Sequence, residues 1–389
     1  MKIGLFINPC QNLFQNGCFQ QSYFIFKALK TANSNIRLFS TGNSSFDNSD
    51  ASFNLIGTPV TLINDINDVV DLDLMLFVSG VLYQEDFLLQ MKTHGTRLVH
   101  VICGNWLCLF QEEWTHNVHQ RASKAFHPEI EEYWVLPMYR DMIPFLTTLT
   151  HRPVYLAPYV WDEEIIDTRC RLGGLQINYP NDNQSRISDK NNQATKEDLL
   201  WHILIMEPNM SIHKTGLLPL LICERLYVEL GYTNIKVLLF CQRETEGFKH
   251  IISMTRLFKD GRIEFYHRME TPLVLHQLRH KNHNNGHIAI VSHQHNNILN
   301  FLHLEMYHYG YPIIHNCPPY QSMGYYYKDD DVISGTDQLW YAIHHHKDTL
   351  GLYQEKAKKL LYQYHFSNPE VYQTWKRMCV ETICRKTRK

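Results

Sequence analysis

The chain has 389 residues, of which 44% are hydrophobic and 20% are charged, and its formal net charge is −2. This balance is typical of a globular protein of about two domains, and it lacks the basic excess of a general nucleic-acid binder. No apolar run approaches the ~18 residues of a membrane-spanning helix. The ten cysteines stand singly, without a Cys-x-x-Cys pair. They predict buried free thiols in a cytoplasmic protein rather than a zinc ribbon.

The first 160 residues alternate between buried strands and amphipathic helices. A strand that is buried on both faces of a parallel sheet has a continuous apolar run, and five such runs occur here. Helical periodicity fills two of the gaps, at residues 19–30 and 83–95. This alternation predicts a doubly wound sheet. The predicted strands cover residues 2–7, 73–79, 96–103, 132–137 and 152–158.

A polar stretch then separates the two halves of the chain. Residues 162–198 are rich in Asn, Asp, Ser and Gln and show no hydrophobic period towards their end. Such composition is typical of a linker or a surface insertion. We therefore place a boundary region at 161–198.

The second half repeats the α/β alternation. Strands are predicted at 199–207, 234–241, 262–269, 287–293 and 311–316. Helices are predicted at 213–230, 337–350, 352–366 and 368–386. The fold class is therefore α/β, with two Rossmann-like doubly wound domains facing a cleft. The predicted domains are 1–160 joined by a C-terminal helix at 369–389, the linker 161–198, and 199–368.

Polar turns at the strand ends are the candidate ligand contacts, because open α/β sheets bind ligands beyond the carboxyl ends of their strands. In the first half these are the loop with Asn16 and Gly17, and the turn with Asn105. In the second half they are the turn with Asn209 and Lys214, and the turn with His293. Lys214 would supply a point charge for a diphosphate.

Glu305 interrupts an apolar helix in the stretch "FLHLEMYHYGYPIIHN" at 301–316. Asn296 and Asn297 are good N-caps for that helix, which we expect to begin near Ile298. Free N–H groups at a helix N-terminus suit a phosphate, and this assigns residues 297–300 to the donor. A carboxylate two turns further on suits the hydroxyls of a ribose. The predicted phosphate contacts are Asn297, Ile298, Leu299 and Asn300.

Motifs of other enzyme classes are missing from the sequence. It contains no GxSxG, P-loop or GxGxxG pattern, so hydrolase, P-loop NTPase and dinucleotide readings lack their motifs. "DLD" at 71–73 has the spacing of a metal-binding D-x-D, but it precedes a strand. The histidine clusters do not by themselves show convergent ligands. We predict neither a metal site nor a cofactor.

The motifs carry a family likeness. "LEMYHYGYPIIHN" resembles the E-A-M-A-x-G-x-P-V-I segment of retaining, family-four GT-B glycosyltransferases, and "DQLWYAI" resembles the segment that follows it. "EPNMSIHK" occupies the place of that family's first C-terminal strand-to-helix turn, where a lysine contacts the donor diphosphate. The chain looks closest to a glycosyltransferase-like family of bacteria and large algal viruses. It shares with that family the following segments: Asn16-Gly17 with Gln20, Cys103-Gly104-Asn105, Val160-Trp161-Asp162, Ser292-His293-Gln294 and His315-Asn316.

One departure from the family-four pattern concerns the donor sugar. Asn297 stands where that family has a second glutamate, eight residues before Glu305. An arginine that normally accompanies the lysine is missing near Lys214, and Arg243 is the candidate substitute. Base recognition is assigned to the backbone near Met269.

The resemblance implies a metal-independent glycosyltransferase that moves a sugar from a nucleotide-diphosphate sugar to a glycan or glycoprotein hydroxyl, with retention. The favoured donor is a UDP-sugar, and the second candidate is a GDP-sugar. A homodimer is one of the assemblies that the sequence allows. The catalytic candidates are Lys214, Glu305 and Asn105. The same architecture also fits a nucleotide-sugar epimerase, for which Glu112 and Glu113 are candidates, or a non-catalytic nucleotide-sugar binder. If the source is a virus, the location would be the host cytoplasm.

Overall fold

The chain divides into two compact units, Met1–Thr168 with Leu361–Lys389, and Arg169–Leu360. Each unit is built on one parallel β-sheet. No helix of the described residues combines the length and the apolar composition needed to cross a membrane. The computed structural model describes residues 1–7, 13–14, 17–41, 57–78, 85–116, 126–180, 200–241, 246–281, 287–296 and 300–385.

The first unit holds a seven-stranded parallel sheet in the order β3-β2-β1-β4-β5-β6-β7. All five predicted strands are present. Strands β2 and β3 were not predicted, because β2 mixes polar and apolar residues and β3 has only four residues, one of them Thr61. The strands are β1 (Lys2–Phe6), β2 (Asn35–Thr41), β3 (Val60–Ile63), β4 (Leu74–Val78), β5 (Arg97–Ile102), β6 (Glu132–Val135) and β7 (Val154–Leu156).

The strand order of this sheet reverses between β1 and β4, which lie side by side with Ile3 opposite Leu74. Right-handed crossovers place the helices of the two directions on opposite faces. The helices are α1 (Gly17–Thr31), α3 (Glu85–Thr93), α4 (Trp106–His116) and α5 (Ile143–Thr150), with the short 3₁₀ turns η1 (Ile66–Asp68) and η3 (Pro137–Met142).

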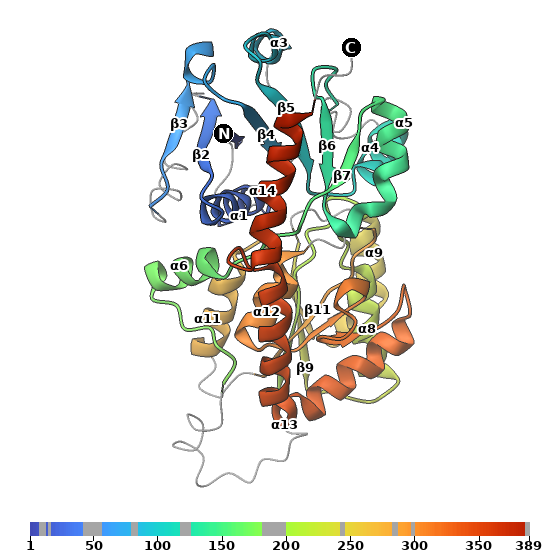
Figure 1. Ribbon diagram of the computed structural model, residues 1–389. Coiled ribbons are helices and arrows are strands. Elements are labelled where there is room, and N and C mark those ends of the chain that lie inside the picture. The colour runs from blue at the N-terminus through green and yellow to red at the C-terminus, as the bar shows by residue number, and fades with distance from the viewer. Residues whose placement is uncertain are drawn as a thin grey trace. The chain divides into compact units, whose positions relative to one another are not determined.

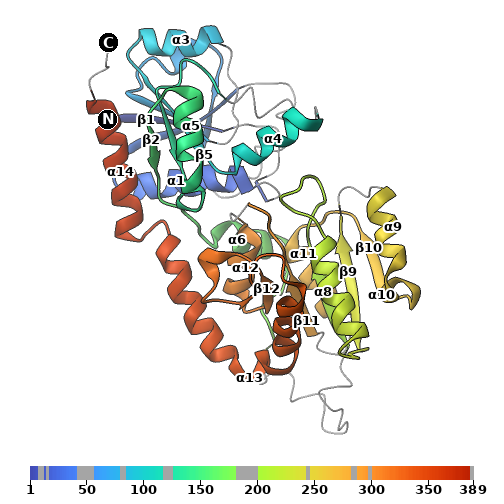
Figure 2. The same cartoon turned by 90° about the vertical axis from the view of Figure 1, so that its right-hand side faces the viewer.

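The C-terminal helix α14 (Pro369–Cys384) belongs to the first unit and lies beside α1 (Figure 2). Its Trp375 ring packs 5.7 Å from Trp134 of β6, centroid to centroid, and its indole N–H donates to the Pro158 carbonyl at 3.1 Å. Thr382 donates to the buried Glu132 carboxylate at 2.8 Å. These contacts bury one face of α14, so the end of the chain completes the first unit.

The second unit holds a six-stranded parallel sheet in the order β10-β9-β8-β11-β12-β13. Its order reverses between β8 and β11. Figure 1 shows α8 and α9 on one side of these strands, and α11 and α12 on the other. The strands are β8 (Trp201–Ile205), β9 (Ile235–Phe240), β10 (Ile263–Tyr266), β11 (His287–Val291), β12 (Ile313–His315) and β13 (Tyr325–Tyr326).

One helix, α13 (Val332–Tyr364), replaces the two helices that we predicted at 337–350 and 352–366. Gly351 does not end it, because buried Leu350, Tyr353 and Ala357 continue the same apolar stripe on both sides of the glycine. The other helices of this unit are α8 (Leu217–Val228), α9 (Glu246–Met254), α10 (Arg256–Lys259), α11 (Thr271–Lys281) and α12 (Phe301–Tyr309), with the 3₁₀ turn η5 (Pro318–Tyr320).

The predicted linker is partly wrong, because it contains the helix α6 (Glu164–Gly173). The Asp162 side chain accepts a hydrogen bond from the Glu164 backbone N–H at 2.7 Å, which caps the start of that helix. Ile165 and Ile166 are buried. The polar part of the predicted insertion, 181–198, lies outside the described residues.

Candidate functional site

Two neighbouring strands of the second unit end at the same edge of the sheet. In the register of β8 against β11, Leu204 lies opposite Ile290. Glu207 follows β8 and Ser292 follows β11, so both turns emerge where the strand order reverses. Ligands of doubly wound sheets bind at this kind of switch point.

The Glu207 carboxylate joins these two turns. It is 1% exposed and accepts hydrogen bonds from the Ser292 hydroxyl at 2.7 Å and from the Gln294 amide at 3.0 and 3.2 Å. Burial raises the pKa of Glu207, and the charge of Lys214 together with these donors opposes that rise. His303 of α12 contacts the same Ser292 hydroxyl at 3.1 Å, so α12 is tied to the cluster.

A second set of contacts fixes the side chain of His293, one of the predicted donor contacts. Its Nδ1 lies 2.9 Å from the Tyr327 hydroxyl and its Nε2 lies 3.1 Å from an Asp330 oxygen. Asn316, after β12, exchanges two hydrogen bonds with the backbone of Gln294 at 2.9 and 3.0 Å. The His293 side chain is only 3% exposed, so it is covered by protein and its contacts hold the turn in place.

The loop between β8 and α8 carries the predicted Asn209 and Lys214. Asn209 adopts a left-handed backbone conformation with φ of 53°, and its side-chain oxygen accepts from the Gly216 N–H at 2.7 Å. This bond satisfies one free donor at the start of α8, so Asn209 shapes the loop. His213 exchanges contacts of 3.0 and 2.9 Å with the backbone of His295, which ties this loop to the turn after β11. Lys214 is half-buried.

Helix α12 begins at Phe301, and our predicted start near Ile298 with Asn296 or Asn297 as N-cap is wrong. The N-cap is Asn300, whose side chain accepts from the Leu302 N–H at 3.2 Å. The position of the cap is set by burial, since Phe301 and Leu302 pack into the core. The predicted phosphate contacts Asn297, Ile298 and Leu299 lie outside the described residues, and so does Arg243.

Glu305 lies on the one face of α12 that is not buried. Its helix neighbours on the other faces are buried, whereas Glu305 and His308, three residues apart, are half-buried. Burial raises the pKa of Glu305 to about 7, and the charge of His308 opposes the rise. Among the residues that the structure describes, none donates a hydrogen bond to this carboxylate. It is therefore the acceptor that a ligand hydroxyl could reach.

The remaining predicted residues take simpler positions. Gly17 is the first residue of α1, and Asn105 caps α4 by accepting from the Cys108 N–H at 3.1 Å. Both belong to the first unit, whereas Asn209, Lys214, His293, Asn300 and Glu305 belong to the second. Met269 follows β10 and is half-buried.

The epimerase candidates Glu112 and Glu113 both lie on α4 of the first unit. Glu112 is 8% exposed and Glu113 is half-buried. The Glu112 side chain is thus largely covered by protein, so a sugar ring would reach it poorly.

Our predictions missed Glu207, Gln294 and His303 as site residues. The sequence did carry a signal for the first two, since polar side chains directly follow two apolar strands. No comparable signal marked His303, because a single histidine in an apolar helix is usually a packed core residue. Its contact with Ser292 depends on the tertiary structure.

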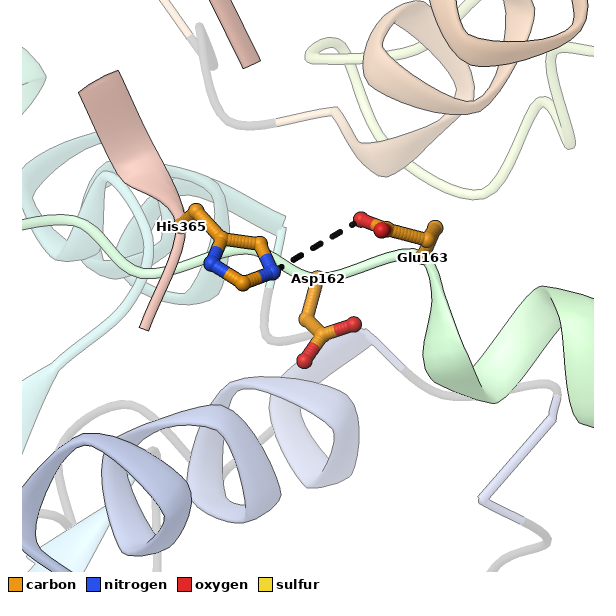
Figure 3. Close-up of side chains that lie close together, drawn as sticks. All are labelled: Asp162, Glu163 and His365. Carbon is orange, nitrogen blue, oxygen red and sulfur yellow. Dashed lines mark ion pairs between the residues drawn. The ribbon is translucent and has the colours of Figure 1, made fainter. Parts of the chain in front are cut away.

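A group of possible metal ligands lies in the first unit, where Asp162, Glu163 and His365 place one ligand atom each within 4.8 Å of one another (Figure 3). His365 Nε2 is 4.0 Å from the Glu163 carboxylate. Asp162 already forms an ion pair with Lys27 and caps α6 with its other oxygen. Lys27 therefore occupies the position from which a cation would bind Asp162, and the group fits a structural junction better than a metal centre.

A model of the family described as "Protein of unknown function (DUF2827)" matches residues 2–379. The chain belongs to this family. A search of curated proteins by sequence finds no match.

Solved structures resemble the whole chain in fold. An α,α-trehalose 6-phosphate synthase of Burkholderia multivorans matches with a TM-score of 0.56, at 9% identity over 98% of both chains. Trehalose-6-phosphate protein from E. coli, bound with UDP-2-fluoro glucose, gives 0.57, at 9% identity over 99% of this chain and 100% of that one. Anabaena HepE in complex with UDP and glucose gives 0.57, at 10% identity over 97% and 99%. At such identities the likeness shows the fold, which is the GT-B fold of two Rossmann-like units.

Proposed function

We propose that this protein is a glycosyltransferase that takes its sugar from a nucleoside-diphosphate sugar. The observation that carries the proposal is Glu305, a half-buried carboxylate on a helix whose other residues except His308 are buried, with no hydrogen-bond donor among the described residues. A half-buried carboxylate that receives no hydrogen bond from the protein is open to donors that a ligand supplies. The two hydroxyls of a ribose are such donors.

The surrounding geometry suits the rest of the donor. Asn300 caps the N-terminus of α12, and Glu305 is the fifth residue of that helix, about 6 Å along its axis from Phe301. A diphosphate at the N-terminus and a ribose at Glu305 are therefore compatible in spacing. Lys214, in the loop between β8 and α8, supplies a positive charge for the diphosphate.

The reaction we propose breaks the bond between the anomeric carbon and the diphosphate oxygen and forms one to an acceptor hydroxyl. The configuration at the anomeric carbon is retained, and the acceptor proton passes to the departing diphosphate. Lys214 and backbone N–H groups stabilise the negative charge that develops on that leaving group, without a metal ion. The proposed acceptor is a glycan or glycoprotein hydroxyl. Asn105 is a proposed catalytic residue and Gly17 a proposed donor contact.

The proposed donor is a UDP-sugar, followed by a GDP-sugar. Two of the similar structures contain UDP or a UDP-sugar analogue, which supports this order. The backbone near Met269, after the strand β10, is the proposed contact of the base.

The experiment is a product assay. The purified protein is incubated with UDP- and GDP-sugars, and the released nucleoside diphosphate is measured for wild type, Glu305→Gln and Lys214→Ala. Exposed residues of the second unit provide matched controls, namely Glu246→Gln and Lys359→Ala, because they make the same change of charge.

We expect release with one donor, a loss of at least tenfold in each site variant, and wild-type rates in the controls. Retention is read from the anomeric configuration of the product by NMR. Equal rates in all five proteins would contradict the assignment of the site. Conversion of the donor sugar without release of nucleoside diphosphate would identify an epimerase instead.

A further inference from the structure

Two side chains share the open face of α12. Glu305 and His308 are three residues apart, and residues at this spacing on a helix are neighbours, with their Cβ atoms about 5–6 Å apart. Both are half-buried, whereas the other residues of the helix are buried. An imidazole therefore lies beside the carboxylate that we assign to the ribose.

The imidazole of His308 is held by packing. Its ring lies 4.7 Å from the ring of Tyr309, centroid to centroid, with the two planes at 76°. The Tyr309 side chain is 6% exposed, and its hydroxyl lies 3.7 Å from the Cys170 sulfur. One side of the His308 ring thus rests on a buried aromatic ring. A group that is ordered before a ligand arrives loses less conformational entropy on binding than a fully solvated one.

The order of these two side chains along α12 matches the order of the hydroxyls on a nucleotide ribose. His308 lies about 4.5 Å further from the helix N-terminus than Glu305. In a nucleoside diphosphate, the 2′ carbon is one bond further from the 5′-phosphate than the 3′ carbon. With the diphosphate at the N-terminus of α12, Glu305 is therefore nearer the 3′-hydroxyl and His308 nearer the 2′-hydroxyl. An imidazole can donate a hydrogen bond to such a hydroxyl or accept one from it.

We propose that His308 is a second contact of the donor ribose, and that it selects ribose over 2′-deoxyribose through the 2′-hydroxyl. The proposal rests on the proposed function, since it assumes that the diphosphate lies at the N-terminus of α12 and the ribose at Glu305. In the E-A-M-A-x-G pattern that this helix resembles, an alanine stands at the position of His308. The methyl group of alanine forms no such hydrogen bond, so the contact belongs to this chain rather than to that pattern.

The test is titration calorimetry with UDP, 2′-deoxy-UDP and 3′-deoxy-UDP, or with the corresponding guanosine compounds if GDP is the nucleotide that binds. Wild type should bind 2′-deoxy-UDP about fivefold more weakly than UDP, because one hydrogen bond is lost. His308→Ala should bind UDP about fivefold more weakly than wild type does, and its preference for UDP over 2′-deoxy-UDP should fall below about twofold. It should still discriminate against 3′-deoxy-UDP, because Glu305 is intact.

Three further variants separate this contact from a structural role. His308→Gln retains a group that donates and accepts, and it should keep a preference for UDP over 2′-deoxy-UDP of about threefold or more. His308→Phe keeps a ring against Tyr309 without the nitrogens, and it should lose that preference as the alanine variant does. The control His250→Ala removes an exposed histidine of α9 and should bind all three ligands as wild type does.

The outcomes that contradict the proposal differ from those that contradict the proposed function. If His308→Ala weakens the three ligands by one common factor, the residue is structural and the proposal is wrong. Should the alanine variant not fold, a preference for UDP that is unchanged in folded His308→Phe would overturn it, as would equal affinity of wild type for UDP and 2′-deoxy-UDP. Absence of binding of every nucleoside diphosphate to wild type would instead remove the proposed function, and this inference with it.

Discussion

Two carboxylates of the second unit differ in their partners. Glu207, at the end of β8, is almost fully buried and receives three side-chain hydrogen bonds from Ser292 and Gln294. Glu305, on the open face of α12, is half-buried and receives none from the described residues. Burial raises the pKa of both groups, but only Glu207 has Lys214 and hydrogen-bond donors to offset the cost.

This difference in hydrogen-bond partners indicates that Glu207 stabilises the fold, whereas Glu305 is available to a ligand. A buried charge with donors stabilises its surroundings, and removing it leaves those donors unsatisfied. A buried charge without donors costs stability in the free protein and gains from a ligand that donates to it. The comparison therefore predicts effects on stability of very different size when each residue is changed.

The largest expected effect is on stability. Glu207→Ala should lower the free energy of unfolding by about 3 kcal/mol, because Ser292 and Gln294 lose their acceptor inside the protein. Glu305→Ala should change it by less than about 1 kcal/mol at pH 7.5. Urea denaturation followed by tryptophan fluorescence measures both, and similar losses in the two variants would break the comparison.

The next effect is on the pH dependence of stability. A folded pKa of about 7 for Glu305, above its ordinary value of 4.5, means that the folded protein holds a proton which the unfolded chain has released. This contribution is complete below pH 4.5 and is lost as the pH rises through 7, with a limit of about 3 kcal/mol. Glu305→Gln should therefore gain stability relative to wild type between pH 5 and 8. A constant difference over that range would contradict the raised pKa.

A third effect concerns donor affinity. Lys214→Ala should weaken binding of the nucleoside diphosphate about tenfold, because the lysine acts as a point charge for the phosphates. Lys359→Ala is the matched control, with its ammonium in an exposed ion pair. The idea fails if the two lysine variants bind the ligand equally well.

The smallest effect concerns the helix that carries Glu305. Asn300→Ala should cost about 1 kcal/mol of stability, since the Leu302 N–H loses its cap. Asn300→Ser keeps a capping oxygen and should restore most of that loss. If the serine variant is as unstable as the alanine variant, the cap does not position α12.

Much of the fold followed from the sequence because strands buried in parallel sheets have continuous apolar runs. The ten predicted strands are present, while β2, β3 and β13 were missed because each is short, mixed in polarity or partly exposed. The helix α6 was missed because its moderate amphipathicity adjoins a polar stretch. Two helices were predicted on either side of Gly351, where α13 is continuous, because glycine is a poor helix former.

The site was harder to predict than the fold. Lys214 and Glu305 could be singled out because one is a cation at a strand end and the other a carboxylate in an apolar helix. The buried partners of Glu207, Ser292 and Gln294, lie in one turn about 85 residues further along the chain. Only the register of β8 against β11 brings that turn close to Glu207. The start of α12 was misplaced because several asparagines could serve as its N-cap. Asn300 is the cap because Phe301 and Leu302, which follow it, are buried in the core.

The most direct test of the central claim is the thermal unfolding of wild type and Glu305→Gln with UDP, GDP, ADP and CMP at pH 7.5. The account predicts that one nucleoside diphosphate at 100 times its Kd stabilises wild type by about 2.7 kcal/mol, and that the shift is much smaller in Glu305→Gln. If no nucleotide shifts wild type, or if the variant shifts equally, Glu305 does not hold the ribose of a nucleotide-sugar.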